Sequence, residues 1–372
     1  MSIIFRCPPE LLLRAATRRA SVIKCKPVFS RTKTHQAAVC KELGKPLLIT
    51  QVPSVQDLTG SQVRIAVRSC GINFADVLLA AGLYQEKPPL PFIPGTEVSG
   101  EVVEVGKSVR KFSKGDRVLG LSQAMQGYAQ ECVLEEMDLW RLPDSMSFEE
   151  GAALPVSYGT AWLGLTRKSN TKKGETVLVT AAAGSVGLAT MDLATNVFGA
   201  KVIGAAGGPD KCSLVMKRGA AHAVDYKAES IREKVKEFTG GRGANVIFDA
   251  VGGDAFKECL RCIAWEGRLV IIGFAGGSIP KIPANILLVK NISAIGLYWG
   301  DFRNKELETW KASINEVMSY FEKGQIKPHI GRTFPLHQVN EAFKYIQQRK
   351  STGCKSSHLN LLFGCFTQEQ IS

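Results

Sequence analysis

The sequence predicts an α/β protein in which a doubly wound parallel sheet is joined to a second, mostly β domain. Three observations predict this fold class. From Thr176 onward, short β-branched runs alternate with longer stretches of helical character, as repeated βαβ units require. Before Tyr158, short alternating strands are separated by glycine and proline turns. Between these parts, an apolar strand runs through a turn of small residues directly into a helix.

Length and composition suit a globular protein of two domains. The chain has 372 residues, of which 45% are hydrophobic, and this is enough to bury one large core or two ordinary ones. No segment is long and apolar enough to span a bilayer. The formal net charge is +13, so the position of that charge decides whether it indicates an anionic partner.

Much of the charge lies at the start of the chain. Residues 1–36 contain eight basic residues and one acid, a net +7, which leaves a mild +6 on the rest. Arginine, serine and apolar residues with almost no acid are typical of a mitochondrial transit peptide. We therefore expect residues 1–35 to direct the protein to the mitochondrial matrix, with cleavage between Ser21 and His35. A disordered basic arm is the alternative.

Ten cysteines are scattered without a framework of regularly spaced pairs. Cys259 and Cys262 form one C-x-x-C pair, but no second pair or nearby histidine completes a set of four zinc ligands. The same spacing places both side chains on one face of a helix. We expect them to be buried in a helix rather than bound to zinc.

Residues 36–158 are expected to form the mostly β domain. Residues 63–68 and 98–105 alternate as strands do, and turns are expected at 94–95 and 114–116.

Residues 159–302 are expected to form the doubly wound sheet. Six strands are predicted at 176–181, 201–205, 222–225, 246–250, 268–273 and 292–298. Helices predicted at 186–198, 210–218, 231–238 and 255–263 are long enough to cross between parallel strands. Residues 303–372 are expected to return to the first domain, with helices predicted at 310–323 and 337–349.

The most specific local feature is the turn between the first of these strands and its helix. Ala181, Gly184 and Gly187 recur at intervals of three, with Ser185 and Val186 between the glycines. Small residues let the backbone approach a pyrophosphate, and the free N–H groups of the helix end donate to phosphates. Ala181 replaces the first glycine of the usual fingerprint. A plain tight turn is the alternative, but the six surrounding strands favour dinucleotide binding.

The end of the second strand distinguishes NADH from NADPH. An NAD-preferring site places Asp or Glu there to hold the ribose 2′-hydroxyl, whereas this sequence has Ala206. Lys211 follows closely and supplies positive charge for a 2′-phosphate. Asp210 argues the other way, but it follows Pro209 at a helix start, where an acid is a good cap. We expect NADPH, with a solvated surface role as the alternative for Lys211.

Several motifs of the first domain resemble one enzyme family. They are GINFAD at 71–76, GLY at 82–84, PFIPGTE at 91–97 and GDRV at 115–118. They resemble the zinc-free quinone oxidoreductase branch of the medium-chain dehydrogenase/reductase superfamily, which includes ζ-crystallin, and the resemblance covers residues 35–353. It implies a GroES-like fold for the β domain and a Rossmann fold for the parallel sheet.

The resemblance also implies a site in the cleft between the domains. Asn73 and Tyr84 are expected beside the nicotinamide and are the candidate catalytic residues. The expected cofactor contacts are Thr160, Ala181, Gly184, Ser185, Val186, Gly187, Lys211, Tyr226, Val251, Gly273, Phe274, Ala275 and Arg349. Of these, Lys211, Tyr226 and Arg349 match family positions around the adenosine 2′-phosphate. Structural roles are the alternatives for Asn73 as a helix cap, Tyr84 as a turn aromatic and Phe274 as a core residue.

Zinc-dependent members of the superfamily take Cys, His and Cys or Asp at three ligand positions. The corresponding residues here are Asn73, Thr96 and Val156, and residues 119–133 lack the clustered cysteines of a structural zinc lobe. No metal is therefore expected.

Hydride transfer needs the nicotinamide held close to an electrophilic acceptor in a dry cleft. The expected acceptors are quinones or other α,β-unsaturated carbonyls, with hydrogen bonds to the developing oxyanion. The nearest alternative is an enoyl thioester or enone reductase of the same fold. An alternative from another class is a nucleotide-gated RNA-binding protein with little catalysis, although the sequence has no basic stripe with interleaved aromatics.

The C-terminal segment departs from the family pattern. Family members finish with a basic-then-apolar strand after the glycine, and residues 354–372 do not. The closing strand is therefore expected to be replaced or disordered. The apolar sixth strand, which in the family often pairs across a dimer, leads us to expect a homodimer.

Overall fold

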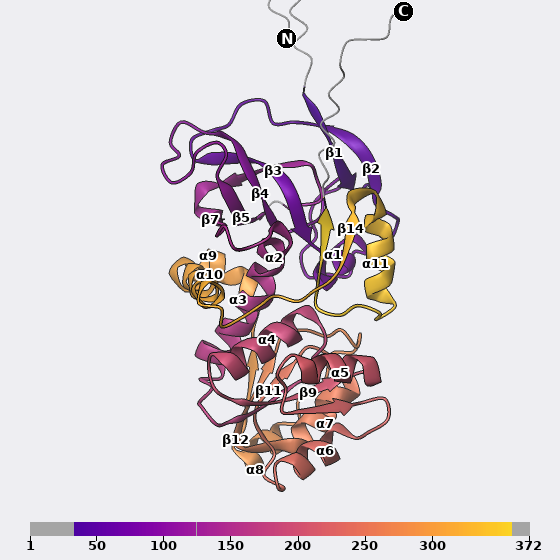
Figure 1. The fold of residues 1–372 in the computed structure, drawn as a ribbon. Helices are drawn as coiled ribbons and strands as arrows, with labels where there is room; N and C mark the ends of the chain where they lie inside the picture. Colours follow the sequence, from indigo (N-terminus) through magenta and orange to yellow (C-terminus); the bar gives the residue numbers. More distant parts are fainter. Residues whose placement is uncertain (1–32, 124, 359–372) are drawn as a thin grey trace, which may run out of the picture. The chain divides into compact units, whose positions relative to one another are not determined.

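The computed structural model describes residues 33–123 and 125–358 (Figure 1). The predicted targeting segment lies almost entirely in residues 1–32, outside the described residues. Within the described part, strands and helices form two lobes, which we call the mixed-sheet lobe and the parallel-sheet lobe after their main sheets.

The mixed-sheet lobe is built on a seven-stranded sheet with the order β14-β15-β3-β4-β5-β7, and β6 also pairs with β3. Its strands are β3 (Gln62–Gly71), β4 (Glu97–Val105), β5 (Arg117–Leu121), β6 (Glu131–Glu135), β7 (Leu139–Arg141), β14 (Ile330–Pro335) and β15 (Cys354–His358). The lobe is completed by the antiparallel pair β1 (Thr34–Val39) and β2 (Leu48–Pro53) and by helices α1 (Phe74–Ala80), α2 (Phe148–Ala153) and α11 (Val339–Gln347). The strands predicted at 63–68 and 98–105 are confirmed as parts of β3 and β4.

Strand β3 shows why this sheet forms. Its β-branched residues Val63, Ile65 and Val67 are fully buried, and β-branched side chains pack well on a pleated surface. Their core also contains Phe343 of α11, so the last described helix covers a sheet that begins far earlier in the chain. Residues 339–347 thus lie in the first lobe, where the C-terminal segment was expected to return.

The parallel-sheet lobe has six strands in the order β10-β9-β8-β11-β12-β13, and all neighbours pair in parallel. The strands are β8 (Thr176–Val179), β9 (Lys201–Ala206), β10 (His222–Asp225), β11 (Ala244–Asp249), β12 (Ile263–Ile271) and β13 (Ser293–Gly296). The helices are α4 (Ser185–Asn196), α5 (Pro209–Lys217), α6 (Ile231–Phe238), α7 (Gly253–Cys262) and α8 (Ala284–Lys290). All six predicted strands and all four predicted crossover helices are confirmed, and only α8 was not predicted.

The strand order reverses between β8 and β11, because the chain first adds β9 and β10 on one side and then β11 to β13 on the other. In open parallel sheets, ligands bind outside the carboxyl ends of the strands at such a switch point. The turn of small residues follows β8 and therefore lies at this position.

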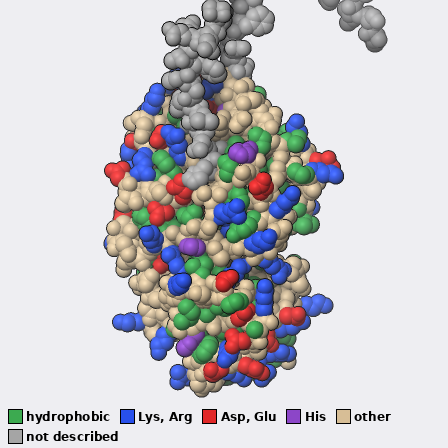
Figure 2. Space-filling view, turned by 45° about the vertical axis from the view of Figure 1, so that its right-hand side comes forward, with side chains coloured by type: hydrophobic (Ala, Val, Ile, Leu, Met, Phe, Trp, Pro, Cys, Tyr) green, Lys and Arg blue, Asp and Glu red, His purple; other side chains and the backbone are tan. Residues whose placement is uncertain are grey.

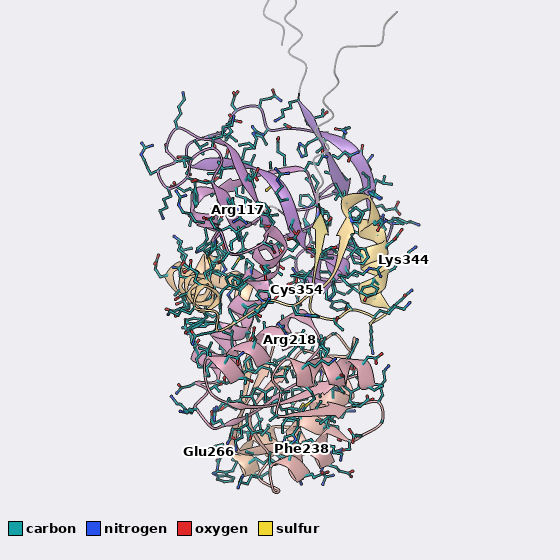
Figure 3. All side chains as sticks on the ribbon, in the orientation of Figure 1. Arg117, Arg218, Phe238, Glu266, Lys344 and Cys354 are labelled. Carbon is teal, nitrogen blue, oxygen red and sulfur yellow. The ribbon has the colours of Figure 1, made fainter. Side chains whose placement is uncertain are left out.

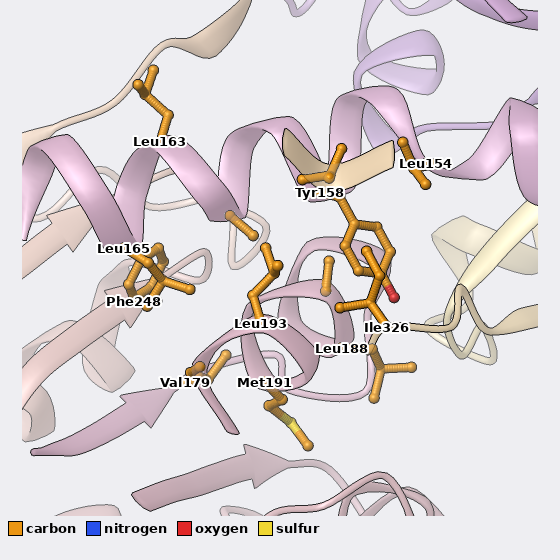
Figure 4. Packing of buried hydrophobic residues seen from close by; sticks show 14 of the residues in the cluster. Leu154, Tyr158, Leu163, Leu165, Val179, Leu188, Met191, Leu193, Phe248 and Ile326 are labelled. Atoms are coloured by element: carbon orange, nitrogen blue, oxygen red, sulfur yellow. The ribbon is translucent and has the colours of Figure 1, made fainter. Parts of the chain in front are cut away.

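Three further helices, α3 (Pro155–Leu163), α9 (Phe302–Lys305) and α10 (Leu307–Glu322), belong to neither sheet. Figure 4 shows α3 packed over α4, with side chains such as Leu188 and Leu193 between them. Within this apolar layer, the Tyr158 hydroxyl donates to Asp192 at 2.7 Å, and the Lys327 amide donates to the same carboxylate at 2.8 Å. The predicted domain boundary after residue 158 falls inside α3.

The expectation that the closing strand is replaced or disordered is wrong for residues 354–358. They form β15, which pairs in parallel with β14 and antiparallel with β3. Ladder bonds come from the backbone, so a polar segment can complete a sheet when its side chains are small enough to be covered. Ser356 and Ser357 meet this condition and are fully buried.

Cys259 and Cys262 are buried on α7, as the spacing predicted. No helix among residues 33–123 and 125–358 is both long and apolar enough to cross a membrane. On the face drawn in Figure 2, lysine and arginine side chains are interspersed with acidic ones over both lobes rather than gathered into one stripe.

Candidate functional site

The turn after β8 has the close backbone packing of a phosphate-binding turn. Ala181 adopts the left-handed region, with φ of 47°, where glycine is the usual residue. The Gly184 amide donates to the Ala181 carbonyl at 2.8 Å, and α4 begins at the next residue. The amides of Ser185, Val186 and Gly187 form the first turn of α4, where N–H groups have no intrahelical acceptor. These donors suit an anionic ligand.

Gly187 allows α4 to approach the turn. A Cβ atom at this position would lie 2.5 Å from the Ala181 carbonyl oxygen and 2.8 Å from the Ala182 Cα, closer than real side chains come. The absence of a side chain is therefore required here.

Asp249, which sequence reasoning missed, organises the neighbouring strand end. It is fully buried at the end of β11 and accepts a hydrogen bond from the Thr180 hydroxyl at 2.7 Å. Its carboxylate also accepts the amides of Val251 and Gly252. Burial raises the pKa of Asp249, and these hydrogen bonds oppose that rise. The carboxylate thus holds the ends of β8 and β11 together and fixes the predicted contact residue Val251.

The loop after β12 packs on this same strand end. The Ala275 amide donates to the Ala250 carbonyl at 2.9 Å, and the Gly276 amide donates to Val251 at 2.8 Å. Gly273, Phe274 and Ala275 therefore lie beside Val251 at the switch point. Thr160 lies on α3 and is half-buried.

Strand β9, which neighbours β8 on the side away from β11, ends at Ala206. Tyr226 follows β10, and its hydroxyl lies so close to Gly207 that a Cβ there would be 2.6 Å away. Asp225 pairs with Ala206 in the β9–β10 ladder, and its Oδ1 atom accepts the amides of Gly208 at 2.8 Å and Lys227 at 3.0 Å. Two backbone donors therefore bind one oxygen of a carboxylate that sequence reasoning overlooked.

Lys211 and Arg349 come together although 138 residues separate them. The Lys211 ammonium group donates to the Arg349 carbonyl oxygen at 2.6 Å. The pKa of Lys211 is lowered, first by burial and then by the charges of Lys227 and Arg349. The structure thus gathers basic groups near the end of β9, where the sequence predicts a 2′-phosphate.

Asn73 immediately precedes α1 and is anchored through its side chain. Its Nδ2 donates to Glu97 Oε1 at 2.8 Å, and the Val156 amide donates to the other oxygen of that carboxylate at 2.9 Å. The Asn73 backbone amide donates to Asp76, which also accepts the Tyr128 hydroxyl at 2.9 Å. Asn73 is therefore held through its side-chain amide by Glu97 and through its backbone by Asp76, two buried carboxylates.

The carboxyl groups of Glu97 and Asp76 both have pKa values above their ordinary range. Burial raises the pKa of Glu97 to about 7, against the lowering effect of the hydrogen bonds from Val156 and Asn73. Burial likewise raises the pKa of Asp76 to about 6. Both groups were missed by sequence reasoning, although Glu97 directly follows a position corresponding to a zinc ligand.

Tyr84 is half-buried, and burial raises the pKa of its hydroxyl. It lies beside Tyr298, whose hydroxyl donates to the exposed carboxylate of Glu86. Tyr298 follows β13 in the other lobe, so this contact joins the two lobes next to the second candidate catalytic residue.

Asn73, Thr96 and Val156, the positions corresponding to the zinc ligands, gather around Glu97 in the fold. Among the described residues, no group of three or more His, Cys, Asp or Glu side chains is arranged to hold a metal ion. What these positions offer for hydrogen bonding is the side-chain amide of Asn73.

Comparisons with known proteins agree with this architecture. The family model "Alcohol dehydrogenase GroES-like domain" matches residues 59–152, and "Zinc-binding dehydrogenase" matches residues 185–318. The chain is 54% identical over 355 residues to a Quinone oxidoreductase-like protein 2 homolog of Nematostella vectensis, covering 94% of this chain and 97% of that one.

Two solved structures are informative. One is the Escherichia coli quinone oxidoreductase complexed with NADPH, with a TM-score of 0.79 and 28% identity, covering 88% of this chain and 99% of the other. The second is the CurK enoyl reductase, with a TM-score of 0.79 and 25% identity over the same shares of the two chains.

Proposed function

Because the chain belongs to the medium-chain dehydrogenase/reductase superfamily and is similar to its quinone oxidoreductase-like members, we propose that it transfers a hydride from NADPH to a quinone or a related α,β-unsaturated carbonyl, without zinc. One observation carries this proposal. The Gly353 amide donates to Ala183 of the dinucleotide turn, and two residues later Lys355 accepts the Ile72 amide beside Asn73. A single short segment thus connects the predicted cofactor turn to the predicted catalytic amide.

The preference for NADPH over NADH is supported at the end of β9. Ala206 offers no carboxylate to a ribose 2′-hydroxyl, and one oxygen of Asp225 already accepts two backbone amides. Lys211 and Arg349 supply positive charge, and Tyr226 supplies a hydroxyl nearby. These groups suit a 2′-phosphate.

The bound dinucleotide supplies the hydride, and the chain's own groups position and stabilise the acceptor. Glu97 fixes the orientation of the Asn73 amide. Tyr84 offers a hydroxyl whose raised pKa keeps it protonated, so it can donate to the oxygen on which charge develops.

An enoyl thioester or enone is the second candidate substrate. It is supported by the similarity to the CurK enoyl reductase, which shares the fold over most of both chains. The same hydrogen-bond donors would stabilise an enolate oxygen.

We also propose that the protein is a homodimer. β13 is the outermost strand of the parallel sheet, so one of its edges has no partner among the described residues. Large apolar side chains are exposed nearby: Leu288 is 76% exposed and Val289 63% on α8. A second copy pairing along β13 would satisfy the free edge and cover these side chains.

Delivery to the mitochondrial matrix is proposed from residues 1–35. β1 begins at Thr34 and pairs along its full length with β2, so removal of the leader is expected before residue 34. Sequencing the N-terminus of the protein recovered from mitochondria tests this proposal, and a mature chain that begins at Met1 would contradict it.

The function itself is tested by titrating the purified protein with NADPH and NADH and then adding a panel of quinones and enoyl thioesters. We expect tighter binding of NADPH and oxidation of NADPH that depends on a quinone. Oxidation only with an enoyl thioester would favour the second substrate class. Absence of nucleotide binding would overturn the proposal.

A further inference from the structure

A buried basic side chain without a counter-ion lies where the C-terminal strand meets the dinucleotide turn. Lys355 is the second residue of β15 and is only 6% exposed. Within residues 33–123 and 125–358, no hydrogen bond or ion pair engages its ammonium group, and the nitrogen atom itself is not among the fully buried polar atoms that lack a partner. Arg64 is the only other buried lysine or arginine in this part of the chain, and it is paired with Glu104 and Glu131. Lys355 is therefore the exception among the buried cations.

The backbone around Lys355 lies between the two halves of the candidate site. The preceding Gly353 forms a bridge with Gly184 of the dinucleotide turn. The Lys355 carbonyl accepts the amide of Ile72, the neighbour of Asn73, at 2.9 Å. Figure 3 labels Cys354, the residue between Gly353 and Lys355, near the junction of the two lobes.

The direction of the Lys355 side chain follows from that of Cys354. The Cys354 thiol contacts the Ser157 hydroxyl of α3 at 3.4 Å. Successive side chains of a strand point to opposite faces, so Lys355 faces away from α3.

The charged and titratable groups near Lys355 are basic residues and a histidine, so they make the electrostatic potential around its side chain more positive. The pKa of Lys355 is lowered to about 8, mainly by burial and also by the charge of Lys211. Lys211 itself lies beside Lys227 and Arg349. His329 is also close, since Lys355 and Arg218 both lower its pKa in addition to burial. None of these neighbours is an acid.

A largely buried side chain whose ammonium group has no anion beside it is costly, because it has lost part of its hydration without gaining a counter-charge. A phosphate group would supply the missing charge and hydrogen-bond acceptors. We infer that Lys355 binds a phosphate group of the dinucleotide cofactor. This inference rests on the proposed function, and it adds a ligand-binding residue in the C-terminal strand to those predicted from the sequence.

The test uses Lys355→Met in the full-length protein, because methionine keeps the apolar stem and removes the charge. NADPH affinity is expected to fall by ~10-fold or more, the effect of losing a charge-assisted hydrogen bond. The melting temperature without nucleotide is expected to rise or stay unchanged, because an unpaired buried charge has been removed. Lys344→Met on the exposed side of α11 is the matched control and should alter neither quantity.

Each result has a distinct meaning. An equal loss of NADPH and NADH affinity supports a pyrophosphate contact, and a loss confined to NADPH supports a 2′-phosphate contact. NADPH affinity that is unchanged in Lys355→Met, with tight binding by the wild type, would overturn the inference and leave the proposed function intact. A wild type that binds neither nucleotide would overturn the proposed function itself. If Lys355→Met fails to fold, Lys355→Arg replaces it: retained NADPH affinity supports the inference, and loss of affinity with an unchanged melting temperature counts against a charge contact.

Discussion

Glu97 shows how a single residue can define the chemistry of the cleft. At the positions where zinc-dependent members of the superfamily hold a metal, this chain holds a buried carboxylate between the Asn73 amide and the Val156 backbone. We regard Glu97 as a positioning residue, because it acts through Asn73. Its raised pKa makes this role testable by pH.

The Glu97→Gln variant is expected to change both stability and turnover. A carboxyl whose pKa rises from 4.5 to about 7 on folding contributes stability that is fully present below pH 4.5 and is lost as the pH rises through 7. The variant has no such loss, so its melting temperature relative to the wild type should increase between pH 5 and pH 8. Glutamine has one oxygen and one NH2 group where Glu97 has two accepting oxygens, so either Asn73 or Val156 loses its acceptor. We therefore expect kcat to fall by ~10-fold with little change in the KM for NADPH.

Glu42→Gln, on an exposed loop, is the control and should match the wild type at every pH. A Glu97→Gln variant whose melting temperature follows the wild type in parallel from pH 5 to pH 8 would show that the carboxyl does not titrate in this range. An unchanged kcat would remove the positioning role.

Lys211 provides a second test at the scale of one residue. If it contacts the 2′-phosphate, Lys211→Ala should weaken NADPH binding by ~10-fold or more and leave NADH binding unchanged, because only NADPH carries that group. Lys217→Ala, in the last turn of the same helix and exposed, should change neither affinity. Fluorescence titration with both nucleotides checks this, and an equal loss for both would place Lys211 elsewhere in the site.

At the scale of elements, β15 is the connection between the sheet of the first lobe and the dinucleotide turn. It pairs with β14 on one side and β3 on the other, and the residue before it contacts the turn. That residue, Gly353, has φ of 53°, and a Cβ there would overlap the His329 carbonyl oxygen. A side chain at this position would therefore displace the strand from the turn.

Gly353→Ala is expected to lower the free energy of unfolding by ~2–4 kcal/mol, combining backbone strain with the overlap. Gly324→Ala is the matched control, because Gly324 also has a positive φ, 68°, but no neighbouring atom within 4 Å of a Cβ. It should cost only ~1 kcal/mol. Denaturant unfolding gives both values, and NADPH affinity should fall only for Gly353→Ala. Equal effects of the two substitutions would show that β15 does not depend on this close approach.

At the scale of the whole molecule, the outer edge of β13, with exposed apolar side chains of α8 near it, is the feature that suggests a second copy. Exposed apolar side chains and an unpaired strand edge commonly mark an interface. Leu288→Glu should therefore convert a dimer to a monomer, because it places a charge in the proposed contact.

Light scattering after size exclusion measures the molar mass of each variant directly. Leu48→Glu, on β2 of the other lobe and 49% exposed, should leave the dimer intact. A wild-type protein with the mass of one chain would contradict the dimer proposal.

Much of the fold could be predicted because its signals are local. Short apolar runs of four to seven residues predicted every strand of the parallel sheet, and the spacing of Cys259 and Cys262 predicted a buried helix face. The dinucleotide turn was recognisable because its small residues are consecutive in the chain. Helix α8 was missed, since none of its residues is fully buried and its apolar residues are consecutive, half of them packed on the core and half exposed.

The candidate site could be predicted only in part. Asn73, Lys211, Tyr226 and Arg349 were named from their positions in motifs, but the groups that hold or accompany them were not. Glu97 lies 24 residues from Asn73, and Asp249 lies 69 residues from Thr180. No pattern in the sequence connects such pairs, because their contact depends on which strands become neighbours.

The sequence by itself determined the order of strands and helices, the dinucleotide turn and the absence of an acid at the end of β9, because each depends on residues within one segment. Only the tertiary structure decided that one oxygen of Asp225 accepts two backbone amides, that Glu97 and Asp76 are buried carboxyls, and that the polar segment 354–358 closes the sheet. The reason is that burial and pairing are properties of the folded chain: the same lysine is a solvated surface group or an unpaired buried cation according to what packs around it.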